Sequence, residues 1–235
     1  SFLQRAYDQI LHDVCIQKLP VVFAIDRAGL VGSDGETHQG IFDLSYLSSI
    51  PNMTVMAPKN KWELSDMMKF AVNFNAPIAV RYPRGTAYDG LQEYREPIRP
   101  GVSETIYEES DIALLAVGSM VKTAVSVYET LKSKGYNCSL INARFVKPID
   151  TDILDKLSHN HRLFVTMEEN VESGGYGEKV LDYVYDNNID AHVIRVAIPD
   201  EYVEHGNVDV LKASIGIDDK TIVDRIIAYL NGAGL

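Results

Sequence analysis

The residues best suited to chemistry lie in a polar, glycine-rich stretch at positions 26–40, directly after a short apolar run. Within it, Arg27 can bind an anion, Asp34 can accept hydrogen bonds, and His38 can exchange protons near neutral pH. Glycines in the same stretch allow tight turns and close approach to a ligand. This composition fits a ligand-binding loop about as well as it fits a solvated loop in which Asp34 and Thr37 only make local turns.

A second candidate group lies at residues 81–85, at the end of another apolar run. Pro83 stiffens the turn, so that Arg84 has less conformational freedom to lose when it binds a ligand. A guanidinium can bind phosphate through two parallel hydrogen bonds, which makes Arg27 and Arg84 a candidate phosphate clamp. The alternative is that each arginine only pairs with a surface carboxylate. Arg81 lies inside the predicted strand, and we expect it to be structural.

Residues 168–177 form a third polar stretch, rich in glycine, between a predicted strand and a predicted helix. A turn of this kind can bind phosphate at the amino end of the helix. However, Glu168, Glu169 and Glu172 would repel an anion there, and the stretch has no lysine of the P-loop type. We therefore expect a structural turn or a contact between domains. The remaining histidines have weak claims to catalysis: His12, His159, His161, His192 and His205.

The elements that would position these residues alternate between strands and helices. Short apolar runs predict strands at residues 21–25, 53–57, 78–82, 112–117, 138–142, 163–167 and 192–196. Helical periodicity predicts helices at the start of the chain and at residues 62–74, 121–134, 178–186, 208–213 and 221–230. The pattern lapses after Gly85, where Pro97, Pro100 and Gly101 indicate a linker.

This alternation predicts an α/β fold of two doubly wound, mainly parallel sheets, with one domain at residues 1–100 and another at residues 101–235. Parallel strands deliver the loops that follow them to one edge of the sheet. We therefore expect Arg27 and Arg84 to converge at that edge. Their positive charges would repel each other unless an anion or a carboxylate lies between them.

The composition argues against several classes of protein. The chain has 235 residues, 46% of them hydrophobic and 23% charged, and a net charge of −11. This charge argues against general binding to nucleic acids or anionic membranes, which needs clustered lysine and arginine. Cys15 and Cys138 lie far apart without metal-binding spacing, so neither a disulfide framework nor a zinc site is expected. A reducing cytoplasm fits this cysteine usage, and no apolar run reaches the ~18 residues of a membrane span.

Five segments resemble the deoxyxylulose-phosphate synthases, a family of thiamin-diphosphate-dependent, transketolase-like enzymes. In the order and spacing of that family they are FLQRAYDQ at 2–9, DRAGLVG at 26–32, DGETHQG at 34–40, FDLSY at 42–46 and RYPRG at 81–85. The resemblance implies a partial pyrimidine-binding domain at residues 1–100 and a transketolase carboxyl-terminal domain at residues 101–235. Transketolases share the Asp-Gly-x-Thr-His-Gln pattern, and pyruvate dehydrogenase beta subunits are similar more loosely.

The resemblance implies a transferase that condenses pyruvate with D-glyceraldehyde 3-phosphate and releases carbon dioxide, as a step towards isoprenoids and thiamine. It implies thiamin diphosphate and magnesium as cofactors, and a homodimer as the assembled enzyme. By their positions in the matching segments, Phe2 would stack on the aminopyrimidine ring of the cofactor and Arg5 would lie beside the cofactor and bound substrate.

The resemblance also implies roles for the two polar loops. His38 would transfer protons, and Asp34 would bind a hydroxyl group of the acceptor aldehyde. Arg27 and Arg84 would hold the phosphate of that aldehyde. Together with Phe2, these residues favour a catalytic portion of such a synthase over a regulatory or assembly domain that keeps only the fold. A portion of a transketolase is the other alternative.

The diphosphate and magnesium motif of the family, a Gly-Asp-Gly followed by an Asn, has no counterpart in residues 1–235. The glutamate that activates the aminopyrimidine ring has none either. Both would precede Ser1, and the chain opens directly in helical rhythm. We therefore expect a carboxyl-terminal portion of such an enzyme, inactive by itself.

Overall fold

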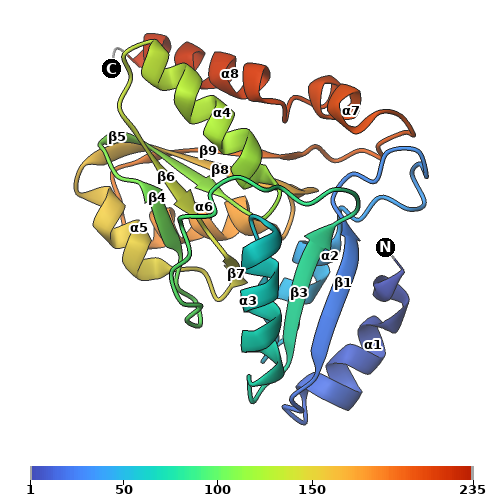
Figure 1. Cartoon of the computed structure of the whole chain (residues 1–235). Coiled ribbons are helices and arrows are strands. Elements are labelled where there is room, and N and C mark those ends of the chain that lie inside the picture. Colours follow the sequence, from blue (N-terminus) through green and yellow to red (C-terminus); the bar gives the residue numbers. More distant parts are fainter. Residues whose placement is uncertain (1, 234–235) are drawn as a thin grey trace.

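The computed structural model describes residues 2–233, which form two sheets flanked by helices (Figure 1). The first sheet has the strand order β1-β3-β2-β7, and the second has the order β4-β6-β5-β8-β9. The strands of the first sheet are β1 (Val22–Ala28), β3 (Ile78–Pro83), β2 (Thr54–Met56) and β7 (Phe145–Lys147). Those of the second sheet are β4 (Glu104–Tyr107), β6 (Cys138–Asn142), β5 (Asp111–Ala116), β8 (His161–Val171) and β9 (His192–Ile198).

Helices connect most of these strands. They are α2 (Asp43–Ser48), α3 (Lys61–Val72), α4 (Met120–Ser133), α5 (Thr151–Ser158), α6 (Tyr176–Asp186), α7 (Val208–Ser214) and α8 (Asp219–Ala233). The chain opens with a 3₁₀ turn (Leu3–Ala6), the short α1 (Tyr7–Gln9) and a π-helical turn (Ile10–Cys15). The predicted opening helix is therefore helical from residue 3 to residue 15, but with three different hydrogen-bond patterns.

The predicted α/β class is confirmed, because most neighbouring strands are parallel. β1 and β2 both run parallel to β3, β5 runs parallel to β6 and β8, and β8 runs parallel to β9. Two short strands that the apolar pattern did not predict run antiparallel, β4 beside β6 and β7 beside β2. Helices α2 and α5 were not predicted either. Because β7 comes after residue 101 in the chain, the second half contributes a strand to the first sheet.

The packing of the core explains why the central strands are continuous apolar runs. Along β5, Ile112 and Leu114 belong to a core cluster that includes residues of α4 and α8. Ala113 and Leu115 point the other way, into a second cluster. That second cluster also contains Val55 of β2, so the two sheets share one core.

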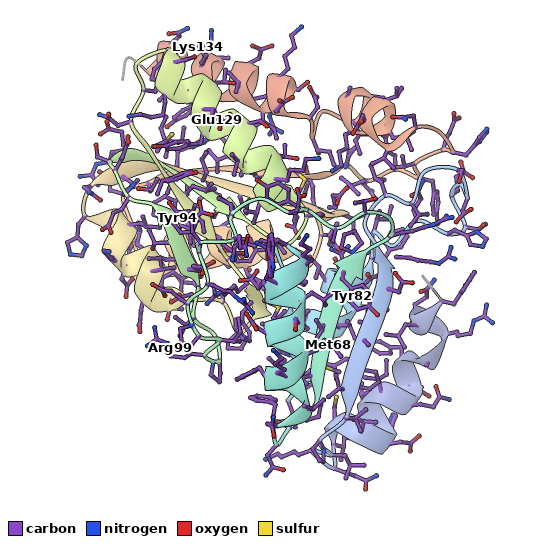
Figure 2. All side chains as sticks on the ribbon, in the orientation of Figure 1. Met68, Tyr82, Tyr94, Arg99, Glu129 and Lys134 are labelled. Atoms are coloured by element: carbon purple, nitrogen blue, oxygen red, sulfur yellow. The ribbon has the colours of Figure 1, made fainter. Side chains whose placement is uncertain are left out.

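A third, smaller cluster lies between α3 and the first sheet. Met67 of α3 and Val80 of β3 are buried there together with Phe145 of β7. Met68 and Tyr82, which Figure 2 labels on α3 and β3, pack against this cluster. The first sheet is therefore covered on both faces, as in a doubly wound fold.

Helix length and the state of the two cysteines are further features of the described residues. No helix within residues 2–233 is long and apolar enough to cross a membrane. Cys15 and Cys138 are both buried free thiols. Burial raises the pKa of Cys138 to about 12, so this thiol is unreactive at neutral pH.

Candidate functional site

Residues 26–40, which comprise the last three residues of β1 and the loop that follows it, are called the site loop, and this segment meets the turn that follows β3. Asp34 lies between the two arginines: its Oδ2 atom is 3.0 Å from Nη1 of Arg27 and 2.6 Å from Nη1 of Arg84. The predicted convergence of Arg27 and Arg84 is confirmed, with a carboxylate between their charges. The side chains of Arg27, Asp34 and Arg84 are 42%, 29% and 47% exposed, so a ligand can reach them from solvent.

The site loop contains residues in the left-handed backbone region, which glycine adopts most readily. Arg27 itself has a φ of 63°, and Gly29 has a φ of 72°. Gly29 and Gly40 then pair through two backbone hydrogen bonds of 2.7 and 2.8 Å, which close the loop at its base. A Cβ atom at position 40 would lie 2.0 Å from the carbonyl oxygen of Arg27, so only glycine fits there.

His38 and two residues from the start of the chain form a second group. The rings of Phe2 and His38 meet edge to face with their centroids 5.1 Å apart, and the guanidinium of Arg5 lies 5.4 Å from the centre of the Phe2 ring. Thr37 Oγ1 lies 2.9 Å from His38 Nδ1. Because Nδ1 is engaged in this way, Nε2 is the ring nitrogen through which His38 can exchange a proton with a substrate.

Arg81 is structural, as its position inside the strand predicts. Its side chain is buried, and its Nε atom donates to Asp43 Oδ2 at 2.9 Å. Its Nη2 atom donates to the carbonyl oxygens of Gly40 and Glu169, each at 2.7 Å. A buried guanidinium needs this degree of pairing. Arg81 thereby joins the base of the site loop to β8 in the second half.

The glutamate-rich stretch at residues 168–177, which comprises the end of β8 and the turn after it, is structural and also joins the two halves, as predicted. Glu168 accepts hydrogen bonds from the backbone N–H groups of Tyr176 and Gly177, both at 2.8 Å, at the amino end of α6. Burial raises the pKa of Glu168 to about 7, although these N–H groups favour its ionised form. Asn170 Oδ1 accepts a hydrogen bond of 3.1 Å from the backbone N–H of Leu44 in the first half.

Beside Arg84, a cleft of about 800 Å³ opens between the two halves. Asp26 and the segment after β3 line it from the first half, and Ser119, Lys122 and Lys212 line it from the second. The cleft gives solvent and small molecules a route to Arg84. Sequence reasoning did not identify the second-half residues, because they are single polar side chains on or next to helices, without a motif.

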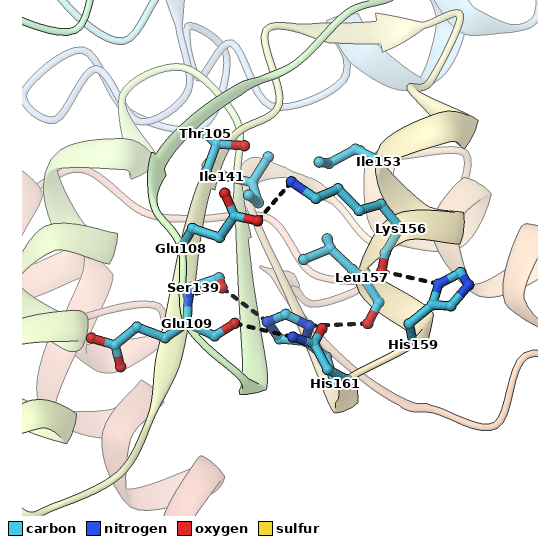
Figure 3. A pocket seen from close by; sticks show the side chains of 11 residues that line it. Thr105, Glu108, Glu109, Ser139, Ile141, Ile153, Lys156, Leu157, His159 and His161 are labelled. Carbon is cyan, nitrogen blue, oxygen red and sulfur yellow. Dashed lines mark hydrogen bonds and ion pairs between the residues drawn. The ribbon is translucent and has the colours of Figure 1, made fainter.

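Another cavity, of about 510 Å³, lies where His161 begins β8 (Figure 3). His161 Nε2 is 2.9 Å from Ser139 Oγ, and its Nδ1 is 3.0 Å from the carbonyl oxygen of Leu157. Burial lowers the pKa of His161, which keeps the ring neutral. Its polar groups are satisfied within the protein, and none of the predicted site residues lines this cavity.

Comparison with known proteins gives the family. Residues 1–88 match the family model of the transketolase pyrimidine binding domain, and residues 101–222 match that of the transketolase C-terminal domain. The chain belongs to the transketolase family. These are the two domain types that the sequence resemblance implied.

The curated relatives of this transketolase-family chain are longer proteins. It is 53% identical over 227 residues to the 1-deoxy-D-xylulose-5-phosphate synthase of Lachnoclostridium phytofermentans, and 49% identical over 230 residues to the protein of the same name from Clostridium tetani. The matches cover 96% and 98% of this chain but 36% and 37% of those relatives. The chain therefore spans about a third of their length.

Solved transketolase structures share the fold. A split gene transketolase, solved as an inactive beta4 tetramer, matches with a TM-score of 0.85 and 25% identity over 97% of this chain and 72% of that one. The transketolase of Campylobacter jejuni matches with a TM-score of 0.67 and 19% identity, over 88% of this chain and 31% of that one.

The transketolase family implies thiamin diphosphate as cofactor, and the residues present fit its aminopyrimidine end. Phe2 presents a half-exposed aromatic ring beside His38 and Arg5, which suits a planar heterocycle. Within residues 2–233, no group of three or more His, Cys, Asp or Glu side chains is arranged to hold a metal ion. The described residues thus offer stacking and hydrogen-bonding groups to the cofactor's ring.

Proposed function

We propose that this chain is the carboxyl-terminal portion of a 1-deoxy-D-xylulose-5-phosphate synthase that condenses pyruvate with D-glyceraldehyde 3-phosphate and releases carbon dioxide. The observation that carries the proposal is the 53% identity, over 96% of the chain, to a protein of that name. The site geometry supports it, because a pair of guanidinium groups and a histidine lie on one solvent-accessible loop and the turn beside it.

The phosphate of the acceptor aldehyde would bind between Arg27 and Arg84. A phosphate dianion offsets two guanidinium charges better than the single carboxylate of Asp34 does, and it offers each guanidinium a pair of oxygens. Asp34, released from the two arginines, would then accept a hydrogen bond from a hydroxyl group of the acceptor. The cleft beside Arg84 supplies the route by which the aldehyde enters.

The donor side of the site would lie at Phe2 and His38. Thiamin diphosphate, when bound, supplies the electron sink that decarboxylation needs. Phe2 would stack on its aminopyrimidine ring, and Arg5 would lie beside the bound cofactor and substrate. His38 would move a proton at Nε2 to or from a substrate oxygen while the carbon–carbon bond forms.

The whole enzyme would contain further parts. Residues 1–100 would belong to its pyrimidine-binding domain and residues 101–235 would be its carboxyl-terminal domain, while another segment would supply the magnesium and diphosphate ligands. We propose a cytoplasmic homodimer that transfers a two-carbon acyl unit and supplies precursors of isoprenoids and thiamine.

A fusion enzyme tests the proposal. It joins the amino-terminal part of the Lachnoclostridium phytofermentans relative to this chain, which replaces the matching part of that relative. With thiamin diphosphate and magnesium, it should consume pyruvate and D-glyceraldehyde 3-phosphate and form 1-deoxy-D-xylulose 5-phosphate, followed by mass spectrometry. The unaltered relative is the positive control. A folded fusion enzyme that instead transfers two-carbon units between sugar phosphates, without using pyruvate, would show that the chain belongs to a transketolase.

A further inference from the structure

We infer that the second half of the chain sets the conformation of the site loop, and that Gln39 is the positioning residue through which it aligns His38. The kinetic part of this inference rests on the proposed synthase function. The structural part does not, because it concerns contacts within the chain.

Gln39 uses both ends of its side-chain amide. The residue is 3% exposed, and its Oε1 atom accepts a hydrogen bond of 2.7 Å from the backbone N–H of Val31, within the site loop. Its Nε2 atom donates to the carbonyl oxygens of Val203 and Glu204, at 3.4 and 3.1 Å. Gln39 therefore ties the loop to itself on one side and to the second half on the other, one residue after His38.

The second-half partner is the segment between β9 and α7, residues 199–207, which we call the docking segment. In Figure 1 it lies beside the loop that follows β1, as the hydrogen bonds of Gln39 require. Val203 is buried in the core cluster of the second sheet. Its carbonyl oxygen is therefore a fixed point, whereas Tyr202, Glu204 and His205 are exposed.

A second contact joins the same two segments through their backbones. The N–H of Gly206 donates to the carbonyl oxygen of Gly32 at 3.2 Å. The approach is so close that a Cβ atom at Gly32 would lie 2.9 Å from the carbonyl oxygen of Gly206. No side chain other than hydrogen fits at position 32 while the docking segment keeps its place.

A third contact holds the base of the loop. A Cβ atom at Gly29 would lie 2.8 Å from Oε2 of Glu169, so the loop rests directly on this side chain. Glu169 is in turn fixed within the second half, by Lys212 at 3.0 Å and by a hydrogen bond from Ser119. Three separate points of the site loop thus contact the second half.

The site loop needs these contacts because it has few hydrogen bonds within itself. Between residues 30 and 39 it has neither helix nor strand, and its internal backbone bonds include His38 to Gly35 at 3.0 Å and Gly35 to Gly32 at 3.4 Å. Catalytic geometry tolerates little error, since a shift of about 1 Å can lower the rate about 10²-fold. A loop held by a rigid neighbour meets this demand better than one held by its own turns.

Two glycines of the loop provide a matched pair of variants. Gly32 and Gly35 both have a φ of 77°, so alanine introduces the same backbone strain at either position. They differ in their surroundings, because a Cβ at Gly35 would only touch His205 Cβ at 3.5 Å. Hydrogen exchange on this chain should therefore show amides of residues 29–40 exchanging roughly tenfold faster in Gly32→Ala than in Gly35→Ala. Equal exchange in the two variants would overturn the inference.

Kinetics of the fusion enzyme test the role of Gln39. Gln39→Glu keeps the acceptor for Val31 but places an oxygen against the carbonyl groups of Val203 and Glu204, whereas Gln39→Met removes all three bonds. We expect both variants to lose kcat/KM by about 10²-fold, at a temperature where circular dichroism shows them folded. In Gln39→Met, which adds no ionisable group, the pH profile of kcat/KM should also shift, because His38 is displaced. Wild-type kinetics or an unshifted profile in Gln39→Met would overturn the positioning role. A wild-type fusion enzyme without synthase activity would instead refute the proposed function, and the exchange comparison would still decide the structural part.

Discussion

Replacing Arg84 with alanine tests the phosphate clamp directly. In the fusion enzyme, the variant loses one guanidinium of a pair that shares Asp34, at 3.0 Å from Arg27 and 2.6 Å from Arg84. One charge-assisted hydrogen bond contributes about 1.5–3 kcal/mol, which corresponds to a roughly 10- to 150-fold change in kcat/KM. Because Arg84 is 47% exposed and solvent screens its charge, we expect a loss nearer the lower limit for D-glyceraldehyde 3-phosphate.

Steady-state kinetics with two acceptors separate phosphate binding from other roles. Unphosphorylated D-glyceraldehyde has no anion to bind, so its kcat/KM should hardly change in Arg84→Ala. Arg95→Ala is the matched control, because Arg95 also pairs with a carboxylate, Asp66 at 2.7 Å, and is 44% exposed, but lies outside the site. We expect it to leave both acceptors unaffected.

Two results would refute this reasoning. Equal losses with both aldehydes would mean that Arg84 supports the site loop or the cofactor, since the phosphate would then make no difference. Equal losses in Arg84→Ala and Arg95→Ala would mean that the effect comes from removing any surface arginine. Only a loss confined to Arg84 and to the phosphorylated acceptor fits a phosphate clamp.

Three further predictions concern other residues and the cofactor. His38→Ala should lower turnover of the fusion enzyme by ~10²–10⁴-fold with little change in melting temperature, and wild-type turnover would remove His38 from the mechanism. Calorimetry of this chain with thiamin diphosphate and magnesium should show only weak binding, because the family's Gly-Asp-Gly and Asn motif has no counterpart in residues 1–235; affinity equal to that of the intact relative would contradict this. Burial raises the pKa of Glu168 from its ordinary 4.5 to about 7, so the folded state binds this proton more tightly than the unfolded state. The free energy of unfolding should then fall as pH rises between these values, by up to about 1.4 kcal/mol per pH unit, and Glu168→Gln should remove this decline. Parallel pH profiles in chemical denaturation of the two proteins would count against it.

Strand burial decided which parts of the fold could be predicted. β5 is buried on both faces, so its sequence is a continuous apolar run that is visible without a structure. β8 runs four residues beyond the predicted end at Met167, because Glu168, Glu169 and Asn170 are polar but buried. β7 has only three residues, and nothing in them indicates that their partner is β2 in the other half.

Some features of the candidate site could likewise be predicted from the sequence, and others could not. Arg27 and Arg84 could be brought together from topology alone, since Arg27 lies at the carboxyl end of β1, Arg84 directly follows β3, and these two strands run parallel in one sheet. The position of Asp34 between the two guanidinium groups could not be predicted from the sequence, because a loop without regular structure does not determine side-chain directions. The bonds from Gln39 to the second half could not be predicted either, because their acceptors are backbone carbonyl groups more than 160 positions away, with no side-chain identity to search for.

A buried network of charges explains why the second half can hold the site loop rigidly. Lys59 and Glu63 in the first half meet Glu104 and Arg144 in the second, with ion pairs of 2.5 to 3.1 Å and side chains at most 2% exposed. Two cations balance two carboxylates, and removing any one would leave an unpaired buried charge at a cost of about 3–5 kcal/mol. The shared core, and the pairing of β7 with β2, also join the two halves. Because the halves cannot move apart without breaking this network, a contact such as that between Gln39 and Val203 is fixed at both ends, and the conformation of the site loop becomes a property of the whole chain.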